Sequence, residues 1–86
     1  MIKTVIKHDG TREDWQGVKF SRWNEWAARD LGIDWPTIML DVVNDCPSTI
    51  TSHDLQLKAA RPIVRGGTWN HYLMAGAMYA PYLHKK

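Results

Sequence analysis

The sequence predicts an α+β fold that is mostly helical, with an N-terminal β-hairpin as a lid over a four-helix bundle. Three observations predict it. An alternating segment around an Asp-Gly pair opens the chain, four later segments carry apolar residues every three or four positions, and 86 residues suffice for only one core. The expected elements of this single domain are a hairpin over residues 2–15 and helices over about 18–31, 35–46, 51–64 and 68–83.

The composition is that of a folded chain, and it narrows the classes of partner. Hydrophobic residues make up 44% and charged residues 23%, and a net charge of +2 gives only weak attraction to polyanions. The single Cys46 excludes an internal disulfide. No run approaches the roughly 18 apolar residues of a membrane span, and the first residues lack the apolar core of a secretory signal. We therefore expect a cytoplasmic protein with no membrane partner.

The hairpin is predicted by side-chain alternation and by its turn. Ile2, Thr4 and Ile6 alternate with their neighbours, and Asp9-Gly10 suits a tight turn. This pattern fits either an ordinary edge hairpin or a flap over a ligand. The pattern alone favours the edge hairpin.

The first helix is predicted by one apolar stripe. Phe20, Trp23, Ala27 and Leu31 are spaced by three, four and four residues, and Gly32 follows as a helix end. A tryptophan in such a stripe belongs to a core more often than to a surface that stacks on bases. We therefore assign the stripe to the core.

The second helix is predicted to begin at Asp34, whose side chain can cap free amides, with Pro36 in the first turn. Ile38, Val42 and Cys46 then recur every four residues. Cys46 on this stripe is interpreted as a small buried hydrophobic residue.

The third and fourth helices are predicted from caps and periodicity. Thr51 and Asp54 have capping-box spacing, Pro62 should kink or end the third helix, and Thr68 is a candidate cap for the fourth. The apolar period of the third helix is Leu55, Ala59 and Ile63. In the fourth helix one side holds Trp69, Tyr72, Gly76 and Tyr79, and another holds Leu73, Ala77 and Ala80.

Candidate binding residues are cationic and lie in the first quarter of the chain. Lysines near the free amides of a helix start can bind phosphate, although lysines on a small hairpin usually only face solvent. Thr49 and His53, four residues apart, would share a face if both lay on one helix, although the spacing alone favours a capping threonine and an exposed histidine. We find no metal-ligand spacing, thiol nucleophile motif or paired carboxylates that predict catalysis. The cationic candidates are Lys3, Lys7, His8 and Lys19.

The segment from Val5 to Glu13, which reads Val-Ile-Lys-His-Asp-Gly-Thr-Arg-Glu, resembles the opening strand and turn of ATP-cone domains. Further matches extend the resemblance over essentially the whole chain. They point to the version at the amino end of aerobic ribonucleotide reductase large subunits. At the family's spacing follow Lys19, Trp26-Ala27-Ala28, Leu31, Thr49, His53, Lys58-Ala59-Ala60, Tyr72-Leu73 and Lys85-Lys86.

The resemblance implies a ligand and a set of site residues. In the family an adenine nucleotide, ATP or dATP, lies beneath the hairpin, and Mg²⁺ is a candidate companion of its phosphates. By resemblance, Lys7 and His8 would face the phosphates, and Lys19 would support them from the first helix. Glu13 would help to recognise adenine or fix the lid. The others would lie near the nucleotide's sugar and phosphates or contact it directly. The implied nucleotide-binding residues are Val5, Lys7, His8, Glu13, Lys19, Thr49, His53 and Lys85.

The sequence departs from the family at several positions. His8 stands where the family has arginine, so an imidazole replaces a permanent bidentate phosphate donor. Thr51 stands where an aspartate is common. Pro62 and the Gly66-Gly67 pair interrupt a region where the family continues or neatly ends a helix.

The resemblance implies an allosteric domain of a reductase large subunit, one that controls overall activity through assembly state and is not an enzyme alone. Its expected partners are the catalytic domain or subunit, other ATP-cones and the radical-generating subunit. One alternative is a degenerate cone that serves only as an assembly surface. The other, from a different class, is a small helical DNA-binding module, which the low net charge disfavours.

Overall fold

Three short strands and four longer helices form along residues 1–79, which are the residues described by this computed structural model. They form a small, mostly helical α+β structure, which confirms the predicted α+β class. The strands are β1 (Thr4–Ile6), β2 (Arg12–Asp14) and β3 (Thr49–Thr51). The helices are α1 (Gly17–Ala28), α2 (Trp35–Asp45), α3 (Ser52–Val64) and α4 (Trp69–Met78).

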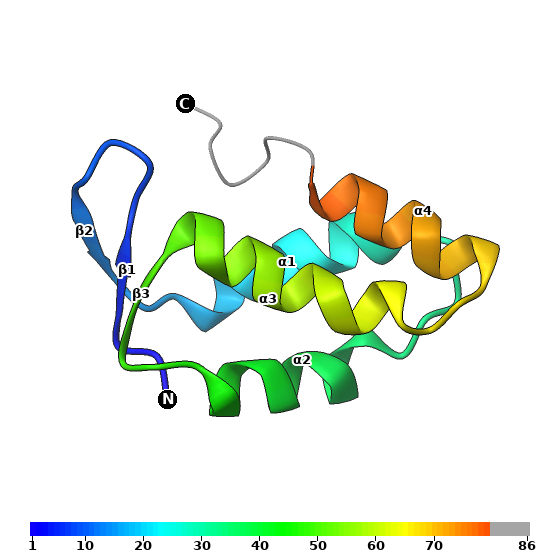
Figure 1. The fold of residues 1–86 in the computed structure, drawn as a ribbon, viewed down its shortest axis with the longest axis horizontal. Helices are drawn as coiled ribbons and strands as arrows, with labels where there is room; N and C mark the ends of the chain where they lie inside the picture. The colour runs from blue at the N-terminus through cyan, green and yellow to red at the C-terminus, as the bar shows by residue number, and fades with distance from the viewer. Residues whose placement is uncertain (80–86) are drawn as a thin grey trace.

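The sheet lies at one end of the helices (Figure 1). Helices α1 and α3 begin at the sheet and run away from it, whereas α2 and α4 run back toward it. Helix α3 packs against both α2 and α4, and α1 packs against α4 and α2. Because the amino ends of α1 and α3 point at the sheet, the partial positive charge of both helix termini is directed there.

The predicted hairpin forms between β1 and β2. The two strands are antiparallel, with Val5 opposite Glu13. At the turn, Thr11 donates to the Asp9 carboxylate from its amide at 3.0 Å and from its hydroxyl at 2.7 Å, and Gly10 adopts a φ of +88°. These hydrogen bonds from Thr11 lower the pKa of the Asp9 carboxyl. The turn is therefore fixed by its own side chains.

Strand β3 is an element that the sequence pattern did not predict. It pairs with β1 in parallel, with Ile50 beside Val5, so that β1 is the central strand of the order β2-β1-β3. Ile50 is buried, and α3 follows the strand without a loop. The expected third helix at residue 51 therefore begins one residue later, after a strand.

Helix α1 confirms the predicted core stripe but ends earlier than expected. Phe20, Trp23 and Ala27 are buried. The helix stops at Ala28, and Asp30 then adopts a left-handed φ of +62°, which a short polar side chain tolerates better than most. The prediction of helix through residue 31, ended by a glycine, was wrong by three residues.

Helix α2 ends one residue before the predicted end, at Asp45, and the predicted Ile38 and Val42 pack against the core without being fully buried. Its buried residue is Met39, whereas Ile38 and Val42 are only half-buried. The expected cap is also incomplete, because the Asp34 carboxylate accepts a hydrogen bond from the Thr37 hydroxyl at 3.1 Å and caps no backbone amide. Cys46 is buried just past the helix, as predicted.

Helix α3 confirms its predicted cap and core. The Thr51 hydroxyl accepts a hydrogen bond from the Asp54 amide at 3.1 Å. Pro62 lies inside the helix, which ends two residues later at Val64. A proline removes one backbone donor from a helix, but because Pro62 lies close to the end, the helix continues for its last two residues. The buried positions include the predicted Leu55, Ala59 and Ile63.

Helix α4 begins after the predicted cap, since the Thr68 hydroxyl accepts from the His71 amide at 3.2 Å. Its buried side, however, is made of residues that the pattern placed on neither face. Gln56 of α3 donates to the Met78 carbonyl at 2.6 Å and so ties the end of α4 to α3. The expected helix beyond residue 79 lies outside the described residues. The buried residues of α4 are Met74, Ala75 and Met78, and the exposed large ones are Trp69, Tyr72 and Leu73.

Replacing Thr51 with alanine should lower the free energy of unfolding by about 1 kcal/mol, because α3 loses the acceptor for its Asp54 amide. Urea denaturation of both proteins measures the change. Thr37→Ala is the matched control, since the Thr37 hydroxyl bonds a side chain and caps no amide. Equal losses in the two variants would contradict the capping role.

Candidate functional site

A pocket lies between the hairpin and the first turns of α1 and α3. Its cavity volume is about 50 Å³. The lining combines charged side chains from the hairpin and α1 with apolar side chains that continue into the core. The lining residues are Val5, Lys7, Glu13, Asp14, Trp15, Gln16, Lys19, Phe20, Ser52 and Leu55.

Two lysines from different elements converge on one carboxylate in this pocket. Lys7 Nζ lies 3.7 Å from Glu13 Oε2, and Lys19 Nζ lies 3.4 Å from Glu13 Oε1. The strand geometry explains the hairpin partners, because Val5 and Lys7 are two positions apart on one face and Glu13 is directly opposite Val5. Lys19 comes from the first turn of α1. A cation, an anion and a second cation are thus held side by side.

These ion pairs are accessible to solvent. The side chains of Lys7 and Lys19 are 44% and 47% exposed, and that of Glu13 is 26% exposed. Exposed ion pairs typically stabilise a fold by only about 0–1 kcal/mol. An anionic ligand can therefore displace Glu13 from the lysines at little cost in folding energy.

The start of α1 borders the pocket, whose lining includes Gln16, Lys19 and Phe20. Its N-cap residue, Gln16, makes no side-chain cap hydrogen bond within the described chain. The amides of the first helical turn, from Gly17 on, have no partner within the helix and carry part of the helix dipole. Asp14, which is also among the lining residues, carries a negative charge that opposes this. The two lysines and two carboxylates of the lining balance in formal charge.

The floor of the pocket is aromatic. Trp15 follows β2 and packs against Phe20 with ring centroids 5.3 Å apart at 50°, and Phe20 packs on Trp23 at 5.7 Å. The row of rings runs from the pocket into the core. The aromatic contacts therefore connect the end of the hairpin to the core.

Sequence reasoning missed most of this floor. Trp15 carried a usable signal, because it lies two positions after Glu13 and so continues the pocket-facing side of β2. Phe20 was assigned only to the core, although it also lines the pocket. Ser52 and Leu55 reach the pocket through the unpredicted β3, which brings the start of α3 to the sheet.

The structure gathers some of the predicted site residues and separates others. Val5, Lys7, Glu13 and Lys19 line one pocket, whereas the pocket lining, taken over residues 1–79, includes none of the remaining predicted residues. His8 lies exposed in the hairpin turn, and Lys85 lies outside the described residues. The other two predicted residues not in the lining are Thr49 and His53.

Thr49 and His53 do not lie on one helix, so the condition for a shared helix face is not met. Thr49 lies in β3 and pairs with Thr4, whereas His53 is the second residue of α3. Both are exposed. The helix starts at Ser52 because Thr51, in extended conformation, is its N-cap.

Other reactive groups do not assemble into a second site in the described part of the chain. Cys46 is buried, and burial raises the pKa of its thiol, so the nucleophilic thiolate is disfavoured. Among residues 1–79, no three or more His, Cys, Asp or Glu side chains gather as metal ligands. No helix in that range has the length and apolar character needed to cross a bilayer.

The comparisons with known proteins do not add to this geometry. No protein-family model, no curated protein and no solved structure matches the chain.

Proposed function

We propose that the chain is a regulatory domain that binds an adenine nucleotide, ATP or dATP, at the hairpin pocket. The observation that carries the proposal is the convergence of Lys7 and Lys19, from the hairpin and from the first turn of α1, on the Glu13 carboxylate. The resemblance to ATP-cones supports the choice of an adenine nucleotide and of a ribonucleotide reductase large subunit as the setting. Control of deoxyribonucleotide synthesis is then the process that it serves.

In the proposed complex, phosphate oxygens replace the Glu13 carboxylate between the two lysines. Charge-assisted hydrogen bonds from Lys7, Lys19 and the first amides of α1 hold the phosphates, with Mg²⁺ as a further counter-charge. The released Glu13 carboxylate accepts from the adenine amino group. The base packs against the aromatic side of the pocket, which Trp15 and Phe20 line.

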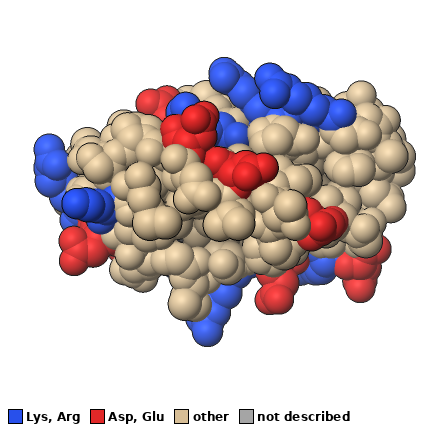
Figure 2. Space-filling model, turned by 90° about the horizontal axis from the view of Figure 1, so that it is seen from below, with Lys and Arg blue, Asp and Glu red and all other residues tan. Residues whose placement is uncertain are grey.

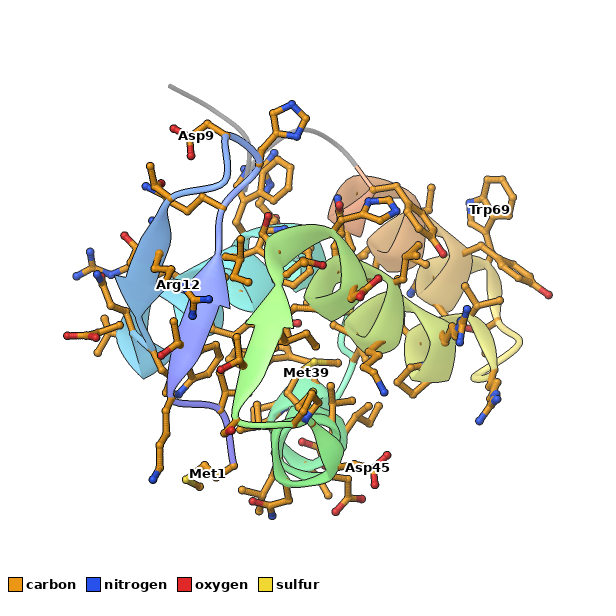
Figure 3. The ribbon with its side chains drawn as sticks, turned by 60° about the vertical axis from the view of Figure 1, so that its left-hand side comes forward. Met1, Asp9, Arg12, Met39, Asp45 and Trp69 are labelled. Carbon is orange, nitrogen blue, oxygen red and sulfur yellow. The ribbon has the colours of Figure 1, made fainter. Side chains whose placement is uncertain are left out.

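The hairpin acts as a lid in this proposal, because the pocket has to enlarge. Ligand sites usually have volumes of about 300–1,000 Å³, whereas this pocket has about 50 Å³. The tip of the hairpin, around Asp9, extends beyond the helices (Figure 3) and is exposed, and in this proposal it lifts while β1 stays paired to β3. Nucleotide binding is thus coupled to hairpin position.

Regulation follows if partners distinguish the two hairpin positions. A ligand shifts an assembly equilibrium only by the difference in its affinity for the two states. The proposed partners are the catalytic part of the reductase, other cones and the radical-generating subunit. The chain itself carries out no reaction in this proposal.

A second candidate function is a degenerate cone that acts only as an assembly surface. It is favoured because Glu13 already forms ion pairs with both lysines, in a pocket of about 50 Å³. If this arrangement does not open, no nucleotide can enter. The two candidates share the fold and differ in ligand binding alone.

Thermal melting with ATP, dATP, GTP and no nucleotide separates the two candidates. One ligand at 100 times its dissociation constant stabilises a single-site binder by about 2.7 kcal/mol. For a domain of this size that corresponds to a rise in Tm of roughly 10–20 °C. We expect this rise with ATP or dATP and a smaller one with GTP. Unchanged melting at millimolar adenine nucleotide would refute nucleotide binding and leave the assembly surface.

A further inference from the structure

A second, larger hollow lies between α2 and α3, away from the hairpin pocket. Each helix contributes residues at positions i, i+3, i+4 and i+7, which form one stripe along its surface. The hollow between the two stripes has a volume of about 630 Å³. The lining residues are Ile38, Asp41, Val42 and Asp45 of α2, Lys58, Arg61 and Pro62 of α3, and Arg65, the residue just after α3.

The two walls of this groove carry opposite charge. The α2 wall bears Asp41 and Asp45, and the α3 wall bears Lys58, Arg61 and Arg65. Figure 2 shows this face, with basic groups gathered along its upper edge and acidic groups in the zone beneath them. Figure 3 shows Asp45 at the end of α2, on the outer side of the molecule.

These charges are not neutralised within the described chain. Over residues 1–79 the ion pairs closer than 4.0 Å are those of Glu13 with Lys7 and Lys19, so none joins the two walls of the groove. All five charged residues of the groove are exposed. Between the walls, Ile38, Val42 and Pro62 are half-buried and make an apolar strip. A central apolar strip with a charged rim is the usual arrangement of a protein interface.

The charge pattern restricts the partner. A polyanion such as nucleic acid would meet repulsion from Asp41 and Asp45, and a polycation would meet repulsion from the α3 wall. A fitting partner carries a basic row and an acidic row in the opposite order, with apolar groups between them. A second copy of this chain meets that requirement by symmetry.

We propose that two copies of the chain associate through this groove. A two-fold axis along the groove, between α2 and α3, places the acidic wall of each copy over the basic wall of the other. The contact is isologous, so each pairing of Asp41 or Asp45 with the partner's basic wall occurs twice. A small interface of about 600 Å² per copy would cover roughly a tenth of the 5556 Å² surface of the chain. The dimer is therefore weak and sensitive to salt.

This inference does not rest on nucleotide binding. The groove and the hairpin pocket share no lining residue. Lys7→Ala, which tests the nucleotide proposal, should leave the association unchanged. The two proposals can thus fail separately.

Sedimentation equilibrium of the 86-residue chain from about 10 µM to 1 mM tests the association, at concentrations suited to a weak interface. We expect a monomer–dimer equilibrium whose dissociation constant rises about tenfold when NaCl is raised from roughly 50 to 500 mM, because exposed charge pairs are screened. A chain that stays monomeric at 1 mM in low salt would overturn the proposal.

Charge reversal locates the interface. The double variant Asp41→Lys with Asp45→Lys, and the double variant Arg61→Glu with Arg65→Glu, should each weaken self-association at least about tenfold. An equimolar mixture of the two should regain association as a heterodimer, since the opposite walls match again. All four residues are exposed, so the folded state is retained, and circular dichroism verifies this.

The matched control reverses two arginines outside the groove, Arg12→Glu with Arg22→Glu. It makes the same change in net charge as the α3 variant and should leave the dissociation constant within about twofold, because distant exposed charges are screened. A mixture of the groove variants that remains monomeric, or a control that weakens association as much as they do, would contradict the assigned surface.

Discussion

Replacing Trp23 with alanine should lower the free energy of unfolding by about 3–5 kcal/mol, which is a large share of the stability of a small domain. Trp23 is 0% exposed and lies between Phe20 and the neighbouring helices. Its removal takes away a large apolar surface and leaves a cavity that the core cannot close. In thermal denaturation the Tm should fall by roughly 15–30 °C.

Trp69→Ala is the matched control for this prediction. Trp69 is 72% exposed and projects from the start of α4 into solvent (Figure 3), so its loss should cost under about 0.5 kcal/mol. Trp23→Phe should fall between the two, because the indole Nε1 of Trp23 has no hydrogen-bond partner in the described chain and its removal leaves no donor behind. A Trp23→Ala protein as stable as Trp69→Ala would contradict the assigned core.

The double variant Lys7→Ala with Lys19→Ala should lose adenine-nucleotide binding almost completely. Hydrogen bonds to charged groups contribute about 1.5–3 kcal/mol each, so losing two of them weakens binding on the order of 100-fold or more. The thermal stabilisation by ATP should disappear with it. Isothermal titration calorimetry of the wild-type and variant chains measures the change directly.

The fold of the variant should be intact, because its ion pairs with Glu13 are exposed and contribute little stability. Lys3→Ala is the matched control, since Lys3 is an exposed hairpin lysine outside the pocket lining. Its dissociation constant should stay within about threefold of wild type, as expected for a screened charge. Equal losses for the single control and the double variant would show that overall charge, and not this pocket, attracts the nucleotide.

The helices were predictable because their signals are local. Caps such as Thr51 and Thr68 act within four residues, and the α1 stripe of Phe20, Trp23 and Ala27 needs only helical periodicity. The end of α1 was misplaced because the expected stop was a glycine. The chain instead turns at Asp30, a left-handed residue with a side chain.

The sides of α2 and α4 that face the core were not predictable from periodicity. Both helices carry apolar residues around much of their circumference, so several stripes fit the spacing equally well. Neighbouring helices decide the outcome, with Met39 buried in α2 and with Met74 and Met78 buried in α4. Strand β3 was missed for a similar reason, since Ile50 has a strand environment only because β1 lies beside it.

The candidate site also contains residues that local patterns predicted and residues that they did not. Lys7 and Glu13 meet through hairpin register, which alternation predicts, and Lys19 joins them because α1 starts directly after β2. Thr49 and His53 were separated by an unpredicted strand boundary. Residues brought in by long-range packing, such as Leu55, had no local signal that tied them to the pocket.

Nucleotide binding at the hairpin pocket can be tested by titrating the isotopically labelled chain with ATP and recording two-dimensional ¹H–¹⁵N nuclear magnetic resonance spectra. We expect saturable shifts of the Lys7, Glu13 and Lys19 amides and of the Trp15 indole, the groups that surround the hairpin pocket. Signals that stay unmoved at millimolar ATP, or shifts confined to the basic wall of α3 from Lys58 to Arg65, would contradict nucleotide binding at this pocket.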